Sequence, residues 1–116
     1  MDQNNYDESS KWFVRGIIVR PEFSYNYYNY GRLLLKMDRP KESLTQFVKA
    51  VDLESNNSDF ILKLIETCEL INEINVRNQY LDILKNNFQL GFFNYSATTK
   101  NQIKRFLENR KIHLEN

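Results

Sequence analysis

Residues 42–53 read Glu-Ser-Leu-Thr-Gln-Phe-Val-Lys-Ala-Val-Asp-Leu, and 34 positions earlier residues 8–19 read Glu-Ser-Ser-Lys-Trp-Phe-Val-Arg-Gly-Ile-Ile-Val. Four aligned pairs are identical, and four more keep charge, small size or branching. A fixed period near 34 residues is typical of proteins built from stacked helical hairpins. This internal match therefore predicts a helical-repeat fold.

Each copy has the hydrophobic spacing of an amphipathic helix. Small and apolar side chains of the second copy recur at i, i+4, i+7 and i+8, on one helix face: Ser43, Phe47, Ala50 and Val51. Pro40 stands in the expected first turn, where its missing N–H has no partner to lose. Asp38 is expected to cap the N-terminus of this helix with its side chain.

A tyrosine-rich segment, residues 25–36, precedes the second copy and also has helical spacing. Its apolar stripe includes Tyr27, Tyr30 and Leu34. Gly31 interrupts it, and an isolated glycine in a helix costs about 1 kcal/mol relative to alanine. We therefore expect a packing reason for Gly31, namely a close approach of the following helix.

Together these segments resemble the tetratricopeptide repeat (TPR) family. The family pattern is W-x2-L-G-x2-Y, then A-x3-F and a late Pro. This chain matches it with Tyr27-x2-Tyr30-Gly31-x2-Leu34, then Ser43-x3-Phe47. Ser55 stands where the Pro is usual, and the first copy has that Pro as Pro21. The resemblance implies an all-α fold of antiparallel hairpins, stacked as a short right-handed solenoid of about five to six helices.

The 116 residues are expected to form one domain, residues 1–116, around one modest core. Its expected parts are a half repeat (6–21), a full repeat (24–57), a degenerate repeat (58–90) and a capping helix (96–114). In the degenerate repeat, residues 76–84 match the second helix one residue out of register. The bulk of Ile65 and Ile83 predicts wider helix separation there. An aromatic linker, residues 91–95, is expected before the capping helix.

Composition excludes several classes of protein. Hydrophobic residues make up 41% and charged residues 27%, which is a globular balance rather than that of a disordered chain. The net charge of +1 supplies no overall attraction to nucleic acid or to membranes. No apolar run approaches the roughly 20 residues that span a bilayer, and the acidic N-terminus is unlike a secretory leader. A cytoplasmic location is expected.

The sequence predicts neither an enzyme nor a metal or cofactor site. His113 is near the C-terminus, and with Cys68 it makes too few ligands for a metal. Three glycines are too far apart for a phosphate-binding loop: Gly16, Gly31 and Gly91. Three glutamates share a helix face, where they are more often solvated than catalytic: Glu66, Glu69 and Glu73. Cys68 lies in an apolar run and is expected to be a buried thiol.

The expected binding surface is the part of the tyrosine-rich helix that repeat packing leaves unused. In the TPR family the first helices line a concave groove for peptides or partner helices, and Tyr and Arg dominate binding hot spots. The candidate partner-binding residues are Tyr25, Tyr28, Asn29, Arg32, Lys36 and Lys63. Alternatively, these tyrosines only cover neighbouring helices. A carboxylate clamp, which some TPR domains use, is not expected, because Lys63 stands where the next Asn would be.

The first helix has no first-helix partner upstream of it. Because a repeat helix cannot bury its apolar face alone, the N-terminal residues fold back, a second copy packs there, or a partner protein completes the repeat. Trp12 and Ile18 are the candidates for self-association into a homo-oligomer. A longer repeat array would explain the missing helix equally well.

Three functions follow in order of preference. The first is a protein-interaction or peptide-binding module, such as an adaptor, chaperone or assembly factor. The second is a small inhibitor of the immunity or antitoxin type, which would occlude an enzyme with the acidic zone of residues 50–82. The third is RNA binding by the basic C-terminal helix with Phe92, Phe93 and Tyr95, which the near-neutral net charge disfavours.

Overall fold

The computed structural model describes residues 3–89 and 97–112, and within these ranges it contains helices and no strand. The helices are α1 (Gln3–Val19), α2 (Ser24–Lys36), α3 (Pro40–Leu53), α4 (Ser58–Leu70), α5 (Ile74–Gln89) and α6 (Ala97–Asn109). Their number and class confirm the all-α prediction. The expected linker at residues 91–95 and the last residues of the expected capping helix, 113–114, lie outside the described ranges.

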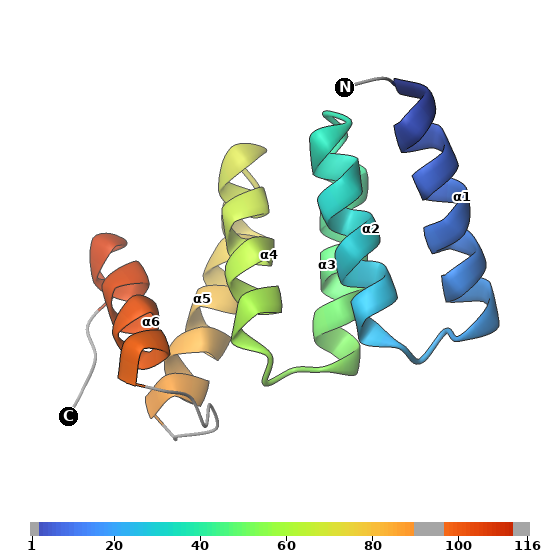
Figure 1. The fold of residues 1–116 in the computed structure, drawn as a ribbon. Coiled ribbons are helices and arrows are strands. Elements are labelled where there is room, and N and C mark those ends of the chain that lie inside the picture. Colours follow the sequence, from blue (N-terminus) through green and yellow to red (C-terminus); the bar gives the residue numbers. More distant parts are fainter. Residues whose placement is uncertain (1–2, 90–96, 113–116) are drawn as a thin grey trace.

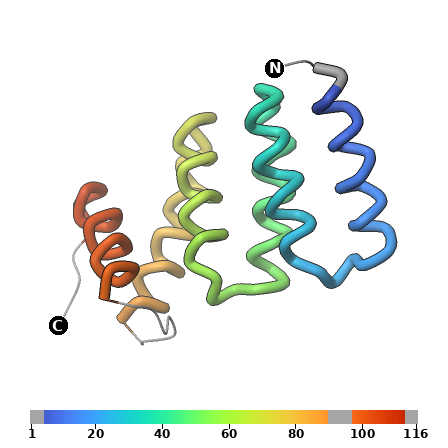
Figure 2. Tube along the Cα trace, in the orientation of Figure 1, coloured from blue at the N-terminus to red at the C-terminus, as the bar shows by residue number. Residues whose placement is uncertain are grey.

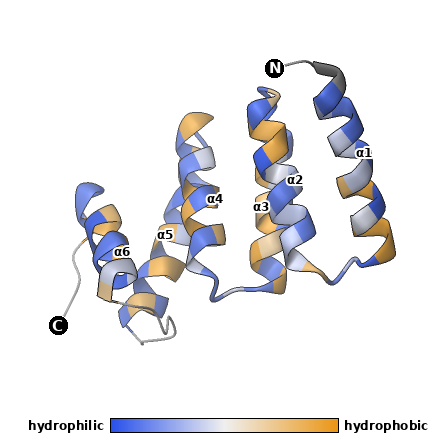
Figure 3. Ribbon diagram, in the orientation of Figure 1, coloured by the Kyte–Doolittle hydropathy of each residue, from blue (hydrophilic) through white to orange (hydrophobic). Residues whose placement is uncertain are grey.

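The helices form antiparallel hairpins that stack into a short solenoid. Each of the first five helices packs most closely on its neighbours in sequence, with α1 at one end of the row and α6 at the other (Figure 1). The trace of the chain shows α2 in front of α3, and α4 in front of α5 (Figure 2). The ribbon coloured by hydropathy shows apolar residues interspersed with polar ones along the helices, and α1 is apolar toward its C-terminal end (Figure 3).

The tight turns inside the hairpins repeat with the sequence period. Asp38 follows α2 with a φ of 58°, and Asn72, 34 residues later, follows α4 with a φ of 61°. Beyond Asp38, the N–H of Arg39 donates to the carbonyl of Leu34 (2.9 Å). This bond and the left-handed residue together form the Schellman ending of a helix. Lys111 ends α6 with the same φ of 61° as Asn72.

The expected role of Asp38 was therefore wrong. It terminates α2 instead of capping α3, because the three-residue connection needs a left-handed residue and aspartate tolerates that conformation better than most. Arg39 occupies the N-cap of α3 and makes no side-chain capping bond. Pro40 begins α3 as expected.

Gly31 is where α2 and α3 approach most tightly. A Cβ atom added at Gly31 would lie 2.6 Å from the Cε1 atom of Phe47. On the same face, the Ser43 hydroxyl donates a hydrogen bond of 2.6 Å to the Gly31 carbonyl. Phe47 and Ser43 are both fully buried. The predicted reason for this helical glycine is confirmed.

The second hairpin lacks such a contact. Ile65 occupies the place of Gly31 and is fully buried, and α4 and α5 approach each other less closely than α2 and α3 do. The start of α5 keeps the 34-residue period. The backbone N–H of Arg77 donates to the Glu73 carbonyl, just as the backbone N–H of Ser43 donates to the Arg39 carbonyl at the start of α3. The expected one-residue shift therefore lies in the buried side chains, where Tyr80 and Leu81 share the place of Phe47.

Cys68 lies on α4, and its side chain is fully buried. Burial, together with the smaller effects of the Glu73 and Glu69 carboxylates, raises the pKa of its thiol to about 11. A thiol that stays protonated at neutral pH is a poor nucleophile. Cys68 is thus a structural residue.

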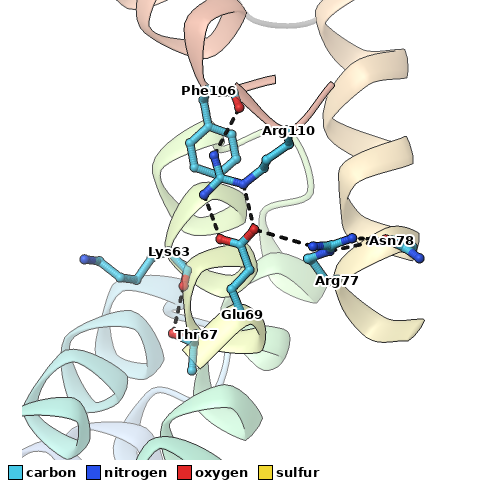
Figure 4. Close-up of polar contacts among 7 residues, drawn as sticks. All are labelled: Lys63, Thr67, Glu69, Arg77, Asn78, Phe106 and Arg110. Carbon is cyan, nitrogen blue, oxygen red and sulfur yellow. Dashed lines mark hydrogen bonds and ion pairs between the residues drawn. The ribbon is translucent and has the colours of Figure 1, made fainter. Parts of the chain in front are cut away.

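An ion pair fixes α6 to α4. The Arg110 guanidinium donates two hydrogen bonds to the Glu69 carboxylate, of 2.8 and 2.7 Å, and lies 3.6 Å from the centre of the Phe106 ring. Figure 4 shows Arg77 approaching the same carboxylate from α5, with nitrogen and oxygen 3.8 Å apart. Ile103 and Leu107 bury the inner face of α6. An ion pair and a buried apolar face therefore hold α6 on the solenoid.

Replacing Gly31 with alanine is expected to destabilise the protein by about 1–3 kcal/mol, because the new methyl group overpacks the buried Phe47 ring. Gly16→Ala is the matched control, since its Cβ would only approach the Asn26 amide at 3.0 Å. The better helix propensity of alanine should leave Gly16→Ala neutral or stabilising. Urea unfolding measures both, and equal effects would contradict the close-contact explanation.

The raised pKa of Cys68 predicts a loss of stability at high pH. The unfolded thiol ionises near pH 9, whereas the folded thiol keeps its proton to about pH 11. The unfolding free energy should therefore fall by up to about 2–3 kcal/mol as pH rises through this window. Cys68→Ala removes this part of the pH dependence and leaves the contribution of Tyr28 and Tyr80, whose pKa values burial also raises. Identical pH profiles of wild type and variant would refute the prediction.

Arg110→Lys is expected to loosen α6 by about 1–2 kcal/mol, because lysine cannot make the two parallel bonds to Glu69. Hydrogen exchange of the α6 amides, compared with those of α2, measures this loss. The control is Arg39→Lys, whose pair with Glu42 is about half exposed on both sides and contributes little. If both variants leave α6 equally protected, the ion pair does not hold this helix.

Candidate partner-binding surface

The exposed side chains of α2 form a stripe along one side of the helix. Tyr25 is 45% exposed, and Arg32 and Lys36 are exposed further along the same helix. Asn29 is half-buried between them. The α2–α3 packing at Gly31 fixes the backbone of this helix. The stripe is thus a row of one aromatic, one amide and two cationic groups on a helix whose backbone is fixed.

Tyr28 belongs to the packing between repeats. Its ring centre lies 4.6 Å from that of Phe60 on α4 and 5.7 Å from that of Phe47 on α3. Tyr25 places its ring edge-on to Phe60 at 5.1 Å but keeps much of its surface exposed. Of the two alternatives for the tyrosines, covering a neighbouring helix describes Tyr28, whereas Tyr25 also offers a free aromatic face.

Charges of both signs surround Tyr28. Burial raises the pKa of its phenol, the Arg32 guanidinium opposes this shift, and the carboxylates of Asp59 and Glu66 add to it. The Arg32 guanidinium also lies 5.7 Å from the centre of the Tyr28 ring. A cation of α2 and two acids of α4 therefore act on the same phenol.

A groove of about 330 Å³ runs between α1 and α2. Its lining comes from both helices: Asn5, Tyr6, Ser9 and Phe13 from α1, and Asn29, Arg32, Leu33 and Lys36 from α2. The groove brings together three of the predicted site residues, and Tyr25, Tyr28 and Lys63 lie outside it. Lys63 is half-buried on α4, where its carbonyl accepts a bond from the Thr67 hydroxyl (Figure 4).

Sequence reasoning missed the α1 wall of this groove. The signal was present in the 34-residue period, because Ser9 and Phe13 align with Ser43 and Phe47, which pack on the first helix of their own hairpin. The groove is thus polar and cationic on its α2 side and partly aromatic on its α1 side.

Trp12 and Ile18, the candidates for self-association, are 64% and 73% exposed on α1. The Arg15 guanidinium lies 5.4 Å from the centre of the Trp12 ring. Neither candidate lines the α1–α2 groove. Self-association through these side chains stays a prediction.

The acidic side chains of the described residues gather into no metal-binding group. Within residues 3–89 and 97–112, no three histidine, cysteine, aspartate or glutamate side chains lie close enough to hold a metal ion. Two of the acids in the 50–82 zone have internal partners, since Glu54 accepts a bond from Ser24 and Glu69 binds Arg110. Among the described helices, none has the length and apolarity needed to cross a bilayer.

The chain is similar over part of its length to known proteins. No family model matches the chain. Over 58 residues it is 33% identical to Protein O-mannosyl-transferase TMTC3 of Homo sapiens and, to the same extent, to that of Mus musculus. The match covers 50% of this chain and 6% of the length of each relative. It shows that half of this chain resembles a short segment of much longer proteins.

Proposed function

We propose that this chain is a non-catalytic protein-interaction module of the TPR type, which binds another protein or a peptide through the exposed side of α2. The observation that carries the proposal is the stripe on this helix, where Tyr25, Arg32 and Lys36 are exposed. Tyrosine and arginine are enriched in the residues that dominate binding energy. The 34-residue period and the turns that repeat with it support the TPR type.

A binding role also agrees with what the stacked helices offer. Loops and helix faces carried by a rigid repeat scaffold form extended recognition surfaces. The buried, protonated Cys68 thiol gives no reactive nucleophile. A reducing, cytoplasmic compartment, which keeps such a thiol free of oxidation, is part of the proposal.

The geometry supports the two alternative functions, an enzyme inhibitor and an RNA-binding protein, less than it supports the interaction module. An inhibitor that uses acidic residues 50–82 would have fewer free carboxylates than the sequence offers, because Glu54 and Glu69 have internal partners. RNA binding would use the exposed Lys100, Lys104 and Arg105 of α6, and the aromatic residues expected to stack with bases lie outside the described ranges. We therefore place both behind the interaction module.

The test is affinity capture from native lysate with wild-type protein and with Tyr25→Ala/Arg32→Ala. These side chains are exposed, so their loss should leave the fold intact, unlike that of Tyr28. The matched control is Thr45→Ala/Lys49→Ala, on the exposed side of α3. The dissociation constant of the recovered protein should rise by at least about tenfold in the α2 variant and stay unchanged in the control.

Two outcomes contradict the proposal. A partner that binds wild type and the α2 variant equally does not use this face. Recovery of nucleic acid alone, with binding that weakens steeply as salt rises, would identify phosphate contacts and replace the interaction module with RNA binding.

A further inference from the structure

The junction between α1 and α2 repeats the junction between α3 and α4. The N–H of Arg20 donates to the Gly16 carbonyl at 2.8 Å, and 34 residues later the N–H of Glu54 donates to the Ala50 carbonyl at 3.0 Å. The next turn also recurs, as Phe23 bonds to the carbonyl of Arg20 and Asn57 to that of Glu54. The same turn thus joins α1 to α2 and α3 to α4.

The space between α3 and α4 on one side of this junction is filled by α2. The Ser43 hydroxyl donates to the backbone carbonyl of Gly31, and the Phe47 ring covers the bare Cα of the same residue. Tyr28 of α2 packs on Phe47 and, across the junction, on Phe60. The slot between α3 and α4 is therefore a receptor for a helix with a small residue at its point of contact.

The α1–α2 groove corresponds to this slot, and no helix among the described residues fills it. Every residue that lines it aligns, at 34 positions, with a residue of α3 or α4 or of the turn before α3. Ser43 and Phe47 are fully buried, whereas their counterparts Ser9 and Phe13 are only half-buried. Among the described residues, the Ser9 hydroxyl has no acceptor comparable to the Gly31 carbonyl.

We propose that the α1–α2 groove receives an amphipathic α-helix of another protein, bound as α2 is bound between α3 and α4. This inference rests on the proposed function and specifies how the module recognises its partner. The bound helix places a small residue against Phe13, where Gly31 meets Phe47, and its backbone carbonyl accepts the Ser9 hydroxyl.

The charged residues of the groove determine which side chains suit the outer edge of the bound helix. Beside α4, Arg32 of α2 lies over the Tyr28 ring, and the carboxylates of Glu66 and Asp59 on α4 act on the phenol of the same tyrosine. In the open groove the counterpart of Glu66 is Arg32 itself, and exposed Lys36 stands where α4 has Leu70. The charge that the groove presents is thus reversed. A partner helix with an acidic side chain opposite Arg32 is the complementary occupant.

A second copy of this chain does not supply that helix through α6. Because Lys111 ends α6 as Asp38 ends α2, counting back from these turns aligns Lys104 with Gly31 and Arg105 with Arg32. Docked in the groove, α6 would press an exposed lysine on Phe13 and oppose two cations. Like charges across an interface disfavour association, so α6 of a second copy is not the occupant.

The test uses a synthetic peptide with the sequence of residues 24–38, in which Arg32 is replaced by Glu and a staple on the solvent side keeps the helix formed. Fluorescence anisotropy measures its binding to the whole protein. The unmodified peptide should bind about tenfold more weakly, and the preference should reverse on protein carrying Arg32→Glu. Ser9→Arg should block both peptides, whereas Thr45→Arg on the exposed side of α3 should block neither.

Three results would overturn the inference. The acidic peptide fails to bind, or it binds Ser9→Arg protein as well as wild type, or sedimentation shows a dimer of this chain that Ser9→Arg dissociates. In each case the proposed function is judged separately by the α2 variant and its recovered partner. A partner lost on Tyr25→Ala/Arg32→Ala but retained by Ser9→Arg would preserve the interaction module and remove only the helix receptor.

Discussion

The close contact between Gly31 and the Phe47 ring is the constraint on which this structure depends. It lets α2 lie deep against α3, which brings the Gly31 carbonyl within reach of the Ser43 hydroxyl. It also places Tyr28 between Phe47 and Phe60, so that the first hairpin is joined to the second by aromatic packing. Hairpin closure and hairpin stacking therefore share the same few side chains.

The α1 end and the α6 end of the solenoid differ in the surface that they expose. At the α6 end, a two-bond ion pair and a guanidinium stacked on Phe106 complete the surface, and Lys104 and Arg105 face solvent. At the α1 end, the groove is open and partly aromatic. A stacked array in which only neighbours touch needs a polar terminal face to stop further stacking. This chain has such a face at α6 and a receptive surface at α1.

The sequence pattern was sufficient for the helices and for the principal core contacts. Spacing alone located the Gly31 contact, because a glycine inside a strong helical stripe requires a partner helix. It could not assign Asp38, since a residue between two helices can cap the second or terminate the first, and only the backbone φ decides. Nor could it separate Tyr25 from Tyr28, which lie less than one helical turn apart and both contact Phe60 but differ in how much of their surface stays exposed.

Other features depend on distances that sequence spacing does not encode. Glu69 and Arg110 are 41 residues apart, a separation that is not the repeat period, so nothing in the pattern pairs them. The α1 wall of the groove was within reach of the same internal alignment that predicted the fold. The prediction used the tyrosines of α2 and did not use the contacts that the counterparts of Ser9 and Phe13 make with α2.

The recurrence of the turns at Asp38 and Asn72, and of the junctions at Arg20 and Glu54, also bears on how the length of such a chain can change. Adding or removing one whole 34-residue unit would rejoin equivalent backbone positions and recreate each junction. Insertion of a few residues inside a helix would instead rotate one face away from its neighbour. Gene duplication and deletion in steps of one unit are thus the structurally conservative route by which this architecture grows or shrinks.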